Sequence, residues 1–146
     1  MNKTKGAGRV FIDTSGFKAL VDPDDEFHAQ AVRIWGDLAG KGIALVTSNY
    51  ILDECYTLIR VRCGVGVVKE FRELLANSGE EIKVMRISLP DELMAWRWFE
   101  NDWSRLSFTD CVSFALMERL GLTKFFGFDE HFERAGFGKI KSLRKG

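Results

Sequence analysis

Short apolar runs alternate with longer amphipathic segments along most of the chain. The runs predict buried strands at 9–12, 43–46, 82–87, 124–128 and 139–143. Between them, apolar residues recur three and four positions apart, which predicts helices. The strand interiors are continuously apolar, so both faces of the sheet must be covered. The pattern therefore predicts an α/β fold with a mainly parallel sheet.

Capping residues mark several of the predicted helix boundaries. Asp22 followed by Pro23 predicts the start of a helix that ends at Gly40. Ser107 and Gly121 have the residue types that begin and end a helix, and the segment between them is apolar almost all round. We therefore expect this last helix to be central in the fold.

Composition and charge narrow the class of protein. The 146 residues, 16.6 kDa in all, predict one domain over 1–146, with the polar segment 1–8 mobile. A hydrophobic content of 46% excludes a disordered chain. Lys and Arg together number 21, as do Asp and Glu, so the net charge is zero and does not indicate nucleic-acid binding. Bound cations could still supply the missing positive charge.

The cysteines and histidines give no sign of a zinc site or of a disulfide framework. Three cysteines include no C-x-x-C pair, and the two histidines lie far apart. No apolar run approaches the length of a membrane span, and Asp13 interrupts the first one, which argues against a signal peptide. We therefore expect no membrane association and a reducing, cytoplasmic setting.

Acidic residues stand where a parallel sheet places its ligands. Asp13 and Asp129 each directly follow a predicted strand, and ligand sites lie beyond the carboxyl ends of such strands. Glu54 interrupts an apolar predicted helix, and Asp110 lies in the first turn of another. Each acid alone also fits a turn, a cap or a solvated face. Together, clustered carboxylates suit Mg²⁺ or Mn²⁺, which would relieve their repulsion.

Four short segments, in this order and at this separation, resemble the PIN domain family, and VapC-type toxin ribonucleases in particular. They are 10–15, 47–54, 106–111 and 128–137. The resemblance implies a three-layer α/β/α sandwich and a metal-dependent endoribonuclease that leaves a 5′-phosphate and a 3′-hydroxyl. It implies an RNA substrate, a cognate antitoxin protein and a homodimer as partners, with Mg²⁺ or Mn²⁺ as cofactor.

The resemblance also implies residue roles. It assigns catalysis and metal binding to an acidic quartet: Asp13, Glu54, Asp110 and Asp129. It assigns the orientation of these carboxylates to three hydroxyls: Ser15, Ser107 and Thr109. One position departs from the family pattern, because Gly127 stands where a Thr or Ser is usual. That makes the placement of Asp129 less secure than that of the other three acids, and it makes Glu130 a candidate to share its work.

Other functions remain open on the sequence alone. A non-catalytic PIN-like module that binds RNA or protein would share the fold. A receiver domain or an aspartyl phosphatase would need a further acid just after Asp13, where Thr14 and Ser15 stand. An aromatic segment at 94–103 predicts core packing or a subunit surface, with Trp96 and Trp98 on different sides of a helix.

Overall fold

The computed structural model describes residues 8–142, and their centre is a five-stranded parallel sheet in the order β3-β2-β1-β4-β5. Its strands are β1 (Arg9–Ile12), β2 (Ala44–Ser48), β3 (Ile82–Met85), β4 (Lys124–Phe126) and β5 (Gly138–Lys139). In the register, Phe11 of β1 lies opposite Val46 on one side and Phe125 on the other. All pairs are parallel, which confirms the predicted sheet. The segment 1–8, predicted to be mobile, lies outside the described residues except for Gly8.

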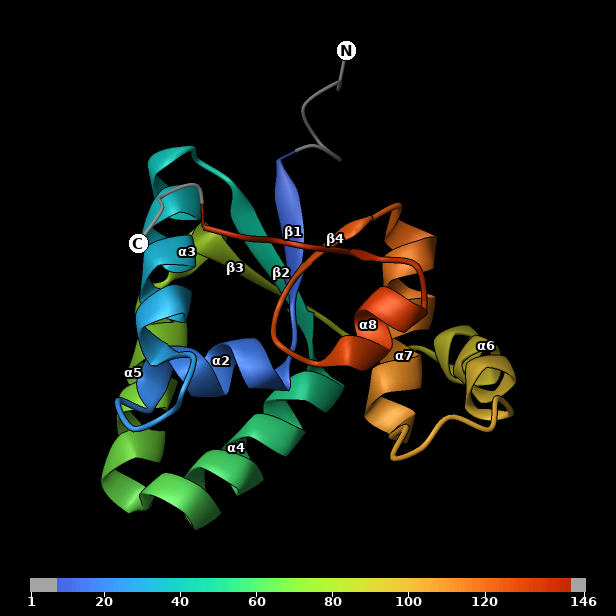
Figure 1. Cartoon of the computed structure of the whole chain (residues 1–146), viewed down its shortest axis with the longest axis horizontal. Coiled ribbons are helices and arrows are strands. Elements are labelled where there is room, and N and C mark those ends of the chain that lie inside the picture. The colour runs from blue at the N-terminus through green and yellow to red at the C-terminus, as the bar shows by residue number, and fades with distance from the viewer. Residues whose placement is uncertain (1–7, 143–146) are drawn as a thin grey trace.

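Seven helices within the same part of the chain cover the sheet. They are α2 (Thr14–Val21), α3 (His28–Gly40), α4 (Asn49–Cys63), α5 (Val65–Asn77), α6 (Leu89–Phe99), α7 (Phe108–Leu120) and α8 (Glu130–Arg134), with a short 3₁₀ turn at Gly79–Glu81. Figure 1 shows α3 and α5 on one side of the sheet and α6, α7 and α8 on the other, so the predicted α/β/α sandwich is confirmed. Helix α4 extends beyond the carboxyl end of β1.

Aromatic side chains fill the core beside the central strands. Phe11 of β1 and Phe125 of β4 both stack on Phe132 of α8, with ring centroids 6.0 and 5.0 Å apart. Phe114 of α7 meets Phe132 edge to face at 4.9 Å. All four rings are fully buried, and each such ring contributes a large apolar area to the core. This cluster fixes α7 and α8 against the sheet.

The predicted boundaries of α7 are confirmed, and the predicted start of α3 is wrong. Ser107 caps α7, and Gly121 ends it with a φ of 70°. Helix α3, however, begins at His28, and Asp22 is instead the C-terminal cap of α2. The reason is a local group of ion pairs: Lys18 of α2 lies 2.9 Å from Asp22 and from Asp25. These carboxylates bind the lysine instead of capping α3.

Three strands are shorter than their apolar runs. Strand β3 ends at Met85 because the Ile87 amide donates to the Asn49 side chain at 2.8 Å. Strand β4 ends at Phe126 because the Phe128 amide donates to Ser15 at 2.8 Å. Strand β5 has only two residues, and the end of the predicted 139–143 strand lies beyond the described part.

Helix α6 packs along α7 and is tied to it by a charge pair. Arg119 of α7 donates to both carboxylate oxygens of buried Asp91 at 2.7 and 3.0 Å. Trp98 packs on Phe114, while Trp96 is 55% exposed, as their spacing predicts. None of the helices in residues 8–142 has the length and hydrophobicity needed to span a membrane.

Candidate active site

Asp13 is held rigidly at the junction of β1 and α2. It is the N-cap of α2, and its Oδ1 accepts from the Gly16 amide at 2.9 Å and from the Ser15 hydroxyl at 2.7 Å. Only 3% of the residue is exposed. Both bonds use Oδ1, so Oδ2 accepts no hydrogen bond from the described residues. The capping role and a ligand role are therefore compatible in one side chain.

Asp129 occupies the corresponding junction of β4 and α8. It is the N-cap of α8 and accepts from the His131 amide at 2.8 Å. Gly127 lies two residues before it, and an added Cβ there would come within 2.6 Å of Asp13 Cγ. A hydroxyl-bearing residue would therefore collide with Asp13. Gly127 therefore leaves the space that the Asp13 carboxylate occupies. Asp129 lines the cavity although position 127 carries no hydroxyl.

Asp110 and Glu54 enter from helices α7 and α4. Asp110 forms a capping box with Ser107, whose hydroxyl accepts from the Asp110 amide at 3.0 Å. Glu54 accepts a hydrogen bond from the Thr14 hydroxyl. Its neighbour Asp53 is exposed, so one acid of the pair faces solvent and the other faces inward, as expected.

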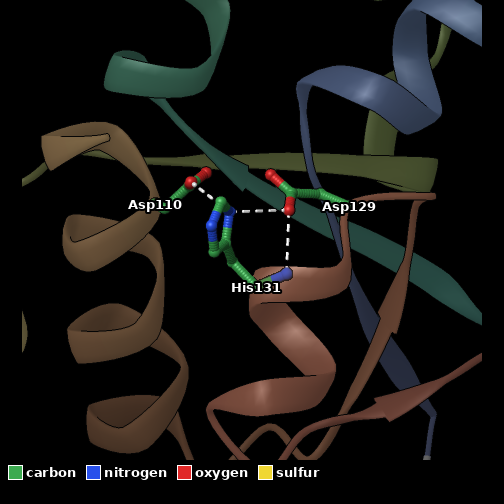
Figure 2. A group of neighbouring side chains, drawn as sticks. All are labelled: Asp110, Asp129 and His131. Atoms are coloured by element: carbon green, nitrogen blue, oxygen red, sulfur yellow. Dashed lines mark hydrogen bonds and ion pairs between the residues drawn. The ribbon is translucent and has the colours of Figure 1, made fainter. Parts of the chain in front are cut away.

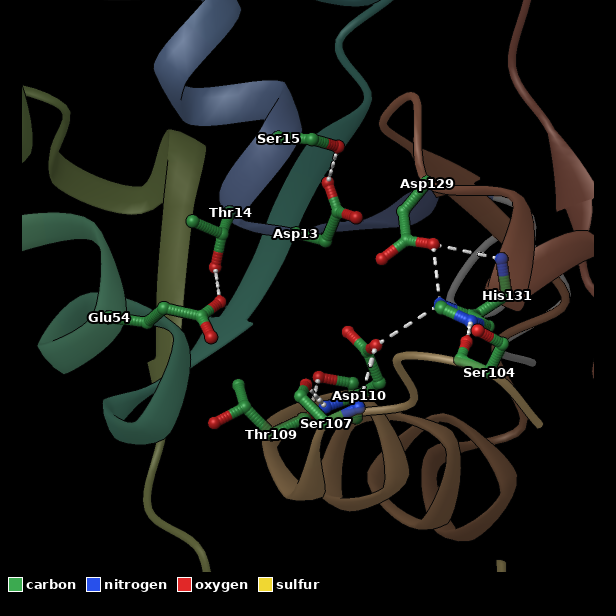
Figure 3. A network of polar contacts seen from close by, with 11 residues as sticks. Asp13, Thr14, Ser15, Glu54, Ser104, Ser107, Thr109, Asp110, Asp129 and His131 are labelled. Carbon is green, nitrogen blue, oxygen red and sulfur yellow. Dashed lines mark hydrogen bonds and ion pairs between the residues drawn. The ribbon is translucent and has the colours of Figure 1, made fainter. Parts of the chain in front are cut away.

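One cavity of about 290 Å³ at the carboxyl edge of the sheet is lined by all four predicted acids. Figure 3 shows the carboxylates of Asp13, Asp110 and Asp129 pointing toward one another, with Glu54 across the cavity. The Thr109 hydroxyl points away from Asp110 in this view. Glu130 is exposed and does not line the cavity, so Asp129 is the acid placed there. The roles of these residues remain predictions.

The cavity is electrostatically costly for its acids. Burial raises the pKa of Asp13 from its ordinary 3.8 to about 7, and the charges of Asp129 and Asp110 add to the effect. Burial also raises the pKa of Asp110 to about 7, with Asp129 again contributing. The hydrogen bonds from Ser15, Gly16 and Ser107 lower these pKa values without restoring them.

The sequence analysis missed His131 and Thr14. Nδ1 of His131 lies 2.9 Å from Asp129 Oδ1 and 3.5 Å from Asp110 Oδ2 (Figure 2). Burial acts to lower the pKa of His131, but the Ser104 carbonyl and the two carboxylates outweigh it and raise the pKa. An Asp-x-His spacing at the end of a strand was the available signal.

The donor set fits a divalent cation. Four carboxylates converge on one cavity, two of them buried with raised pKa values, and Asp13 keeps one oxygen free of hydrogen bonds. Asp110, Asp129 and His131 each bring a ligand atom within 4.8 Å of the others. Mg²⁺ and Mn²⁺ prefer such oxygen-rich sites, and their charge would offset the repulsion among the acids.

Comparison with known proteins identifies the family. The sequence profile of the PIN domain matches residues 10–138, a range that contains all four acids. The chain belongs to the PIN domain family. This PIN domain is 32% identical over 133 residues to VapC20, a 23S rRNA-specific endonuclease of Mycobacterium tuberculosis strains CDC 1551 and H37Rv. The match covers 90% of this chain and 98% of VapC20.

The solved structures give the same relationship. The crystal structure of M. tuberculosis VapC20, described as a toxin that cleaves the sarcin–ricin loop, matches this PIN domain with a TM-score of 0.81. The match covers 90% of this chain and 98% of VapC20, at 32% identity. The resemblance to VapC-type PIN domains is thereby confirmed.

Without divalent cations, this PIN domain should lose thermal stability as the pH rises from about 5 to about 8. Between the ordinary pKa of 3.8 and the folded value of about 7, Asp13 and Asp110 hold protons in the native state that the unfolded chain has released. The cost above pH 7 is on the order of several kcal/mol. Asp13→Asn should reduce this loss of stability, whereas Asp53→Asn, on an exposed residue, should not.

Saturating Mg²⁺ or Mn²⁺ should raise Tm more at pH 8 than at pH 5.5, because the ion binds ionised carboxylates. Calorimetry in the presence and absence of a chelator measures both effects, and a Tm that responds to neither pH nor cation would contradict this account.

Gly127→Ala should weaken divalent-ion binding by about tenfold or more, because the new Cβ would displace the Asp13 carboxylate from its hydrogen bonds. Gly36→Ala is the matched control, since a Cβ at this exposed position of α3 meets no atom within 4 Å. The control should keep its ion affinity and gain up to about 1 kcal/mol of stability. Titration calorimetry compares the two, and equal ion affinities would refute the steric argument.

Proposed function

We propose that this chain is a metal-dependent endoribonuclease and the toxin of a VapBC-type toxin–antitoxin pair. The observation that carries the proposal is the single cavity lined by Asp13, Glu54, Asp110 and Asp129 at the carboxyl edge of a parallel sheet. Similarity to VapC20 over nearly the whole of both chains supports it.

The chemistry would be hydrolysis of a phosphodiester bond. Asp13, Glu54, Asp110 and Asp129 are the residues that would hold Mg²⁺ or Mn²⁺. Once bound, such an ion lowers the pKa of water and offsets negative charge on the scissile phosphate. The chain's own part is positioning: Ser15 and Gly16 fix Asp13, Ser107 fixes Asp110, and Thr14 fixes Glu54. Fixed carboxylates need little reorganisation during the reaction, which favours catalysis.

The substrate and partners follow from the similarity to VapC20. We propose a structured ribosomal RNA as the substrate, because VapC20 acts on 23S rRNA and cleaves the sarcin–ricin loop. Action on ribosomes would place the protein in the cytoplasm. We also propose a cognate antitoxin, since VapC20 is a toxin; a small protein encoded beside this chain that suppresses RNA cleavage would support this.

The rival proposal is a non-catalytic module that binds RNA and leaves it intact. All four acids are present and line the same cavity, which disfavours a degenerate site. Burial, together with the charges of neighbouring acids, also raises the pKa of Asp13 and Asp110, a cost that a binding module has no reason to retain.

Asp13→Asn should reduce RNA cleavage by at least about 100-fold while the protein stays folded, because a key carboxylate charge is lost and its shape is kept. The assay follows cleavage of an RNA containing the sarcin–ricin loop, with Mn²⁺ or with a chelator. Asp53→Asn is the control, as Asp53 neighbours Glu54 but faces solvent. Cleavage retained by Asp13→Asn, or unaffected by chelator, would overturn the mechanism, and RNA bound but uncut by the wild type would favour the rival module.

We propose a homodimer that forms through α6. Leu89, Leu93 and Trp96 form one helical stripe on α6, with 67, 63 and 55% of each residue exposed. An apolar stripe of this kind on a helix is typical of an interface. Leu93→Lys should convert a dimer into a monomer in sedimentation experiments, whereas Val61→Lys, on an exposed apolar residue of a different helix, α4, should not. A monomeric wild type would refute the proposal.

A further inference from the structure

His131 has the hydrogen bonding of a histidine that binds metal. Its Nε2 lies 2.8 Å from the Ser104 carbonyl oxygen, which can only accept, so Nε2 carries a proton. In the neutral imidazole, Nδ1 then presents a lone pair. Histidines that bind metals almost always donate their second ring N–H to a carbonyl or carboxylate, which fixes the ring and its tautomer.

Nδ1 of His131 faces the acids. It is buried, and it lies 2.9 Å from Asp129 Oδ1 and 3.5 Å from Asp110 Oδ2, which are ion-pair distances when the imidazole is protonated. The neutral ring instead presents its Nδ1 lone pair to both carboxylates, an arrangement that a cation between them would stabilise. Two ligands at right angles, each about 2.1 Å from an ion, are about 3.0 Å apart. The 2.9 Å separation from Asp129 is therefore that of neighbouring ligands around one ion, and the 3.5 Å separation from Asp110 is somewhat wider (Figure 2).

The fold fixes the ring in this orientation. Ser104 lies in the loop between α6 and α7, and the next residue, Arg105, has a φ of 61°, the one positive φ of a non-glycine residue within 8–142. The same loop contacts α8, because the Arg134 guanidinium lies 4.6 Å from the centre of the Trp103 ring. Arg105 thus keeps a backbone conformation that costs roughly 1–2 kcal/mol, directly after the Ser104 carbonyl that contacts His131.

We propose that His131 Nδ1 is a direct ligand of the divalent ion, beside Asp110 and Asp129, and that it makes the site prefer Mn²⁺ to Mg²⁺. The inference rests on the proposed metal-dependent function and adds a residue that determines metal specificity. Imidazole nitrogen suits transition metals and adds affinity for Mn²⁺, whereas Mg²⁺ takes oxygen ligands and retains water. The acids alone would make this distinction less strongly.

The first test uses the wild-type protein loaded with Mn²⁺ and pulsed electron paramagnetic resonance. The chain has two histidines, and His28 is engaged elsewhere, with its Nδ1 2.7 Å from the Ala19 carbonyl oxygen. Protein labelled with ¹⁵N only at histidine should replace the ¹⁴N modulation of bound Mn²⁺ by a ¹⁵N signal. The signal should persist in His28→Gln and vanish in His131→Gln.

The second test is calorimetric titration with Mn²⁺ and with Mg²⁺. In His131→Gln the side-chain amide can still donate to Ser104, but no atom replaces Nδ1. Its Kd for Mn²⁺ should rise about tenfold or more, and its Kd for Mg²⁺ by a smaller factor. His131→Asn places an oxygen near the position of Nδ1 and should recover Mg²⁺ binding better than Mn²⁺ binding.

The outcomes separate this inference from the proposed function. Mn²⁺ that binds without histidine coupling overturns the role of His131 and leaves the acidic site standing. Tighter binding of both ions by His131→Gln would also overturn it, because His131 would then be a counter-charge that competes with the ion. A wild type that binds neither ion overturns both proposals.

Discussion

Several acidic side chains are buried close together at one point of this fold, and most features of the site offset the resulting cost of burial and repulsion. Burial and mutual repulsion hold the pKa values of Asp13 and Asp110 at about 7. Backbone amides and hydroxyls from Ser15, Gly16 and Ser107 offset only part of the cost. A bound cation would offset the remainder. Cation binding, stability and acidity would therefore be coupled at this site.

The acids lie where two strands lead into helices. Asp13 caps α2 directly after β1, and Asp129 caps α8 after the short turn that follows β4. Asp13 keeps Oδ1 for its cap and can turn Oδ2 toward a ligand. One side chain can therefore both cap a helix and bind a ligand. The two roles that the sequence analysis set against each other are compatible. The site inherits its rigidity from the sheet.

The apolar pattern was sufficient to predict the parallel sheet, and the caps at Ser107 and Gly121 were sufficient to predict α7. The predictions that failed depended on side-chain contacts that the apolar pattern does not show. Asp22 was predicted to cap α3, but Lys18, four positions before it, binds it instead. Gly127 was interpreted as a lost hydroxyl, because the sequence cannot show how closely Asp13 approaches. His131 was missed since its Ser104 partner lies 27 positions away in the chain.

The two outer strands of the sheet bear on how this protein associates. Strand β3 carries an exposed lysine, Lys83, and strand β5 is only two residues long and ends at Lys139. Short, charged edges are poor templates for an incoming strand, so sheet extension from one molecule to the next is disfavoured. Self-recognition is then left to helical surfaces, which can pair in closed, finite assemblies rather than in fibrils.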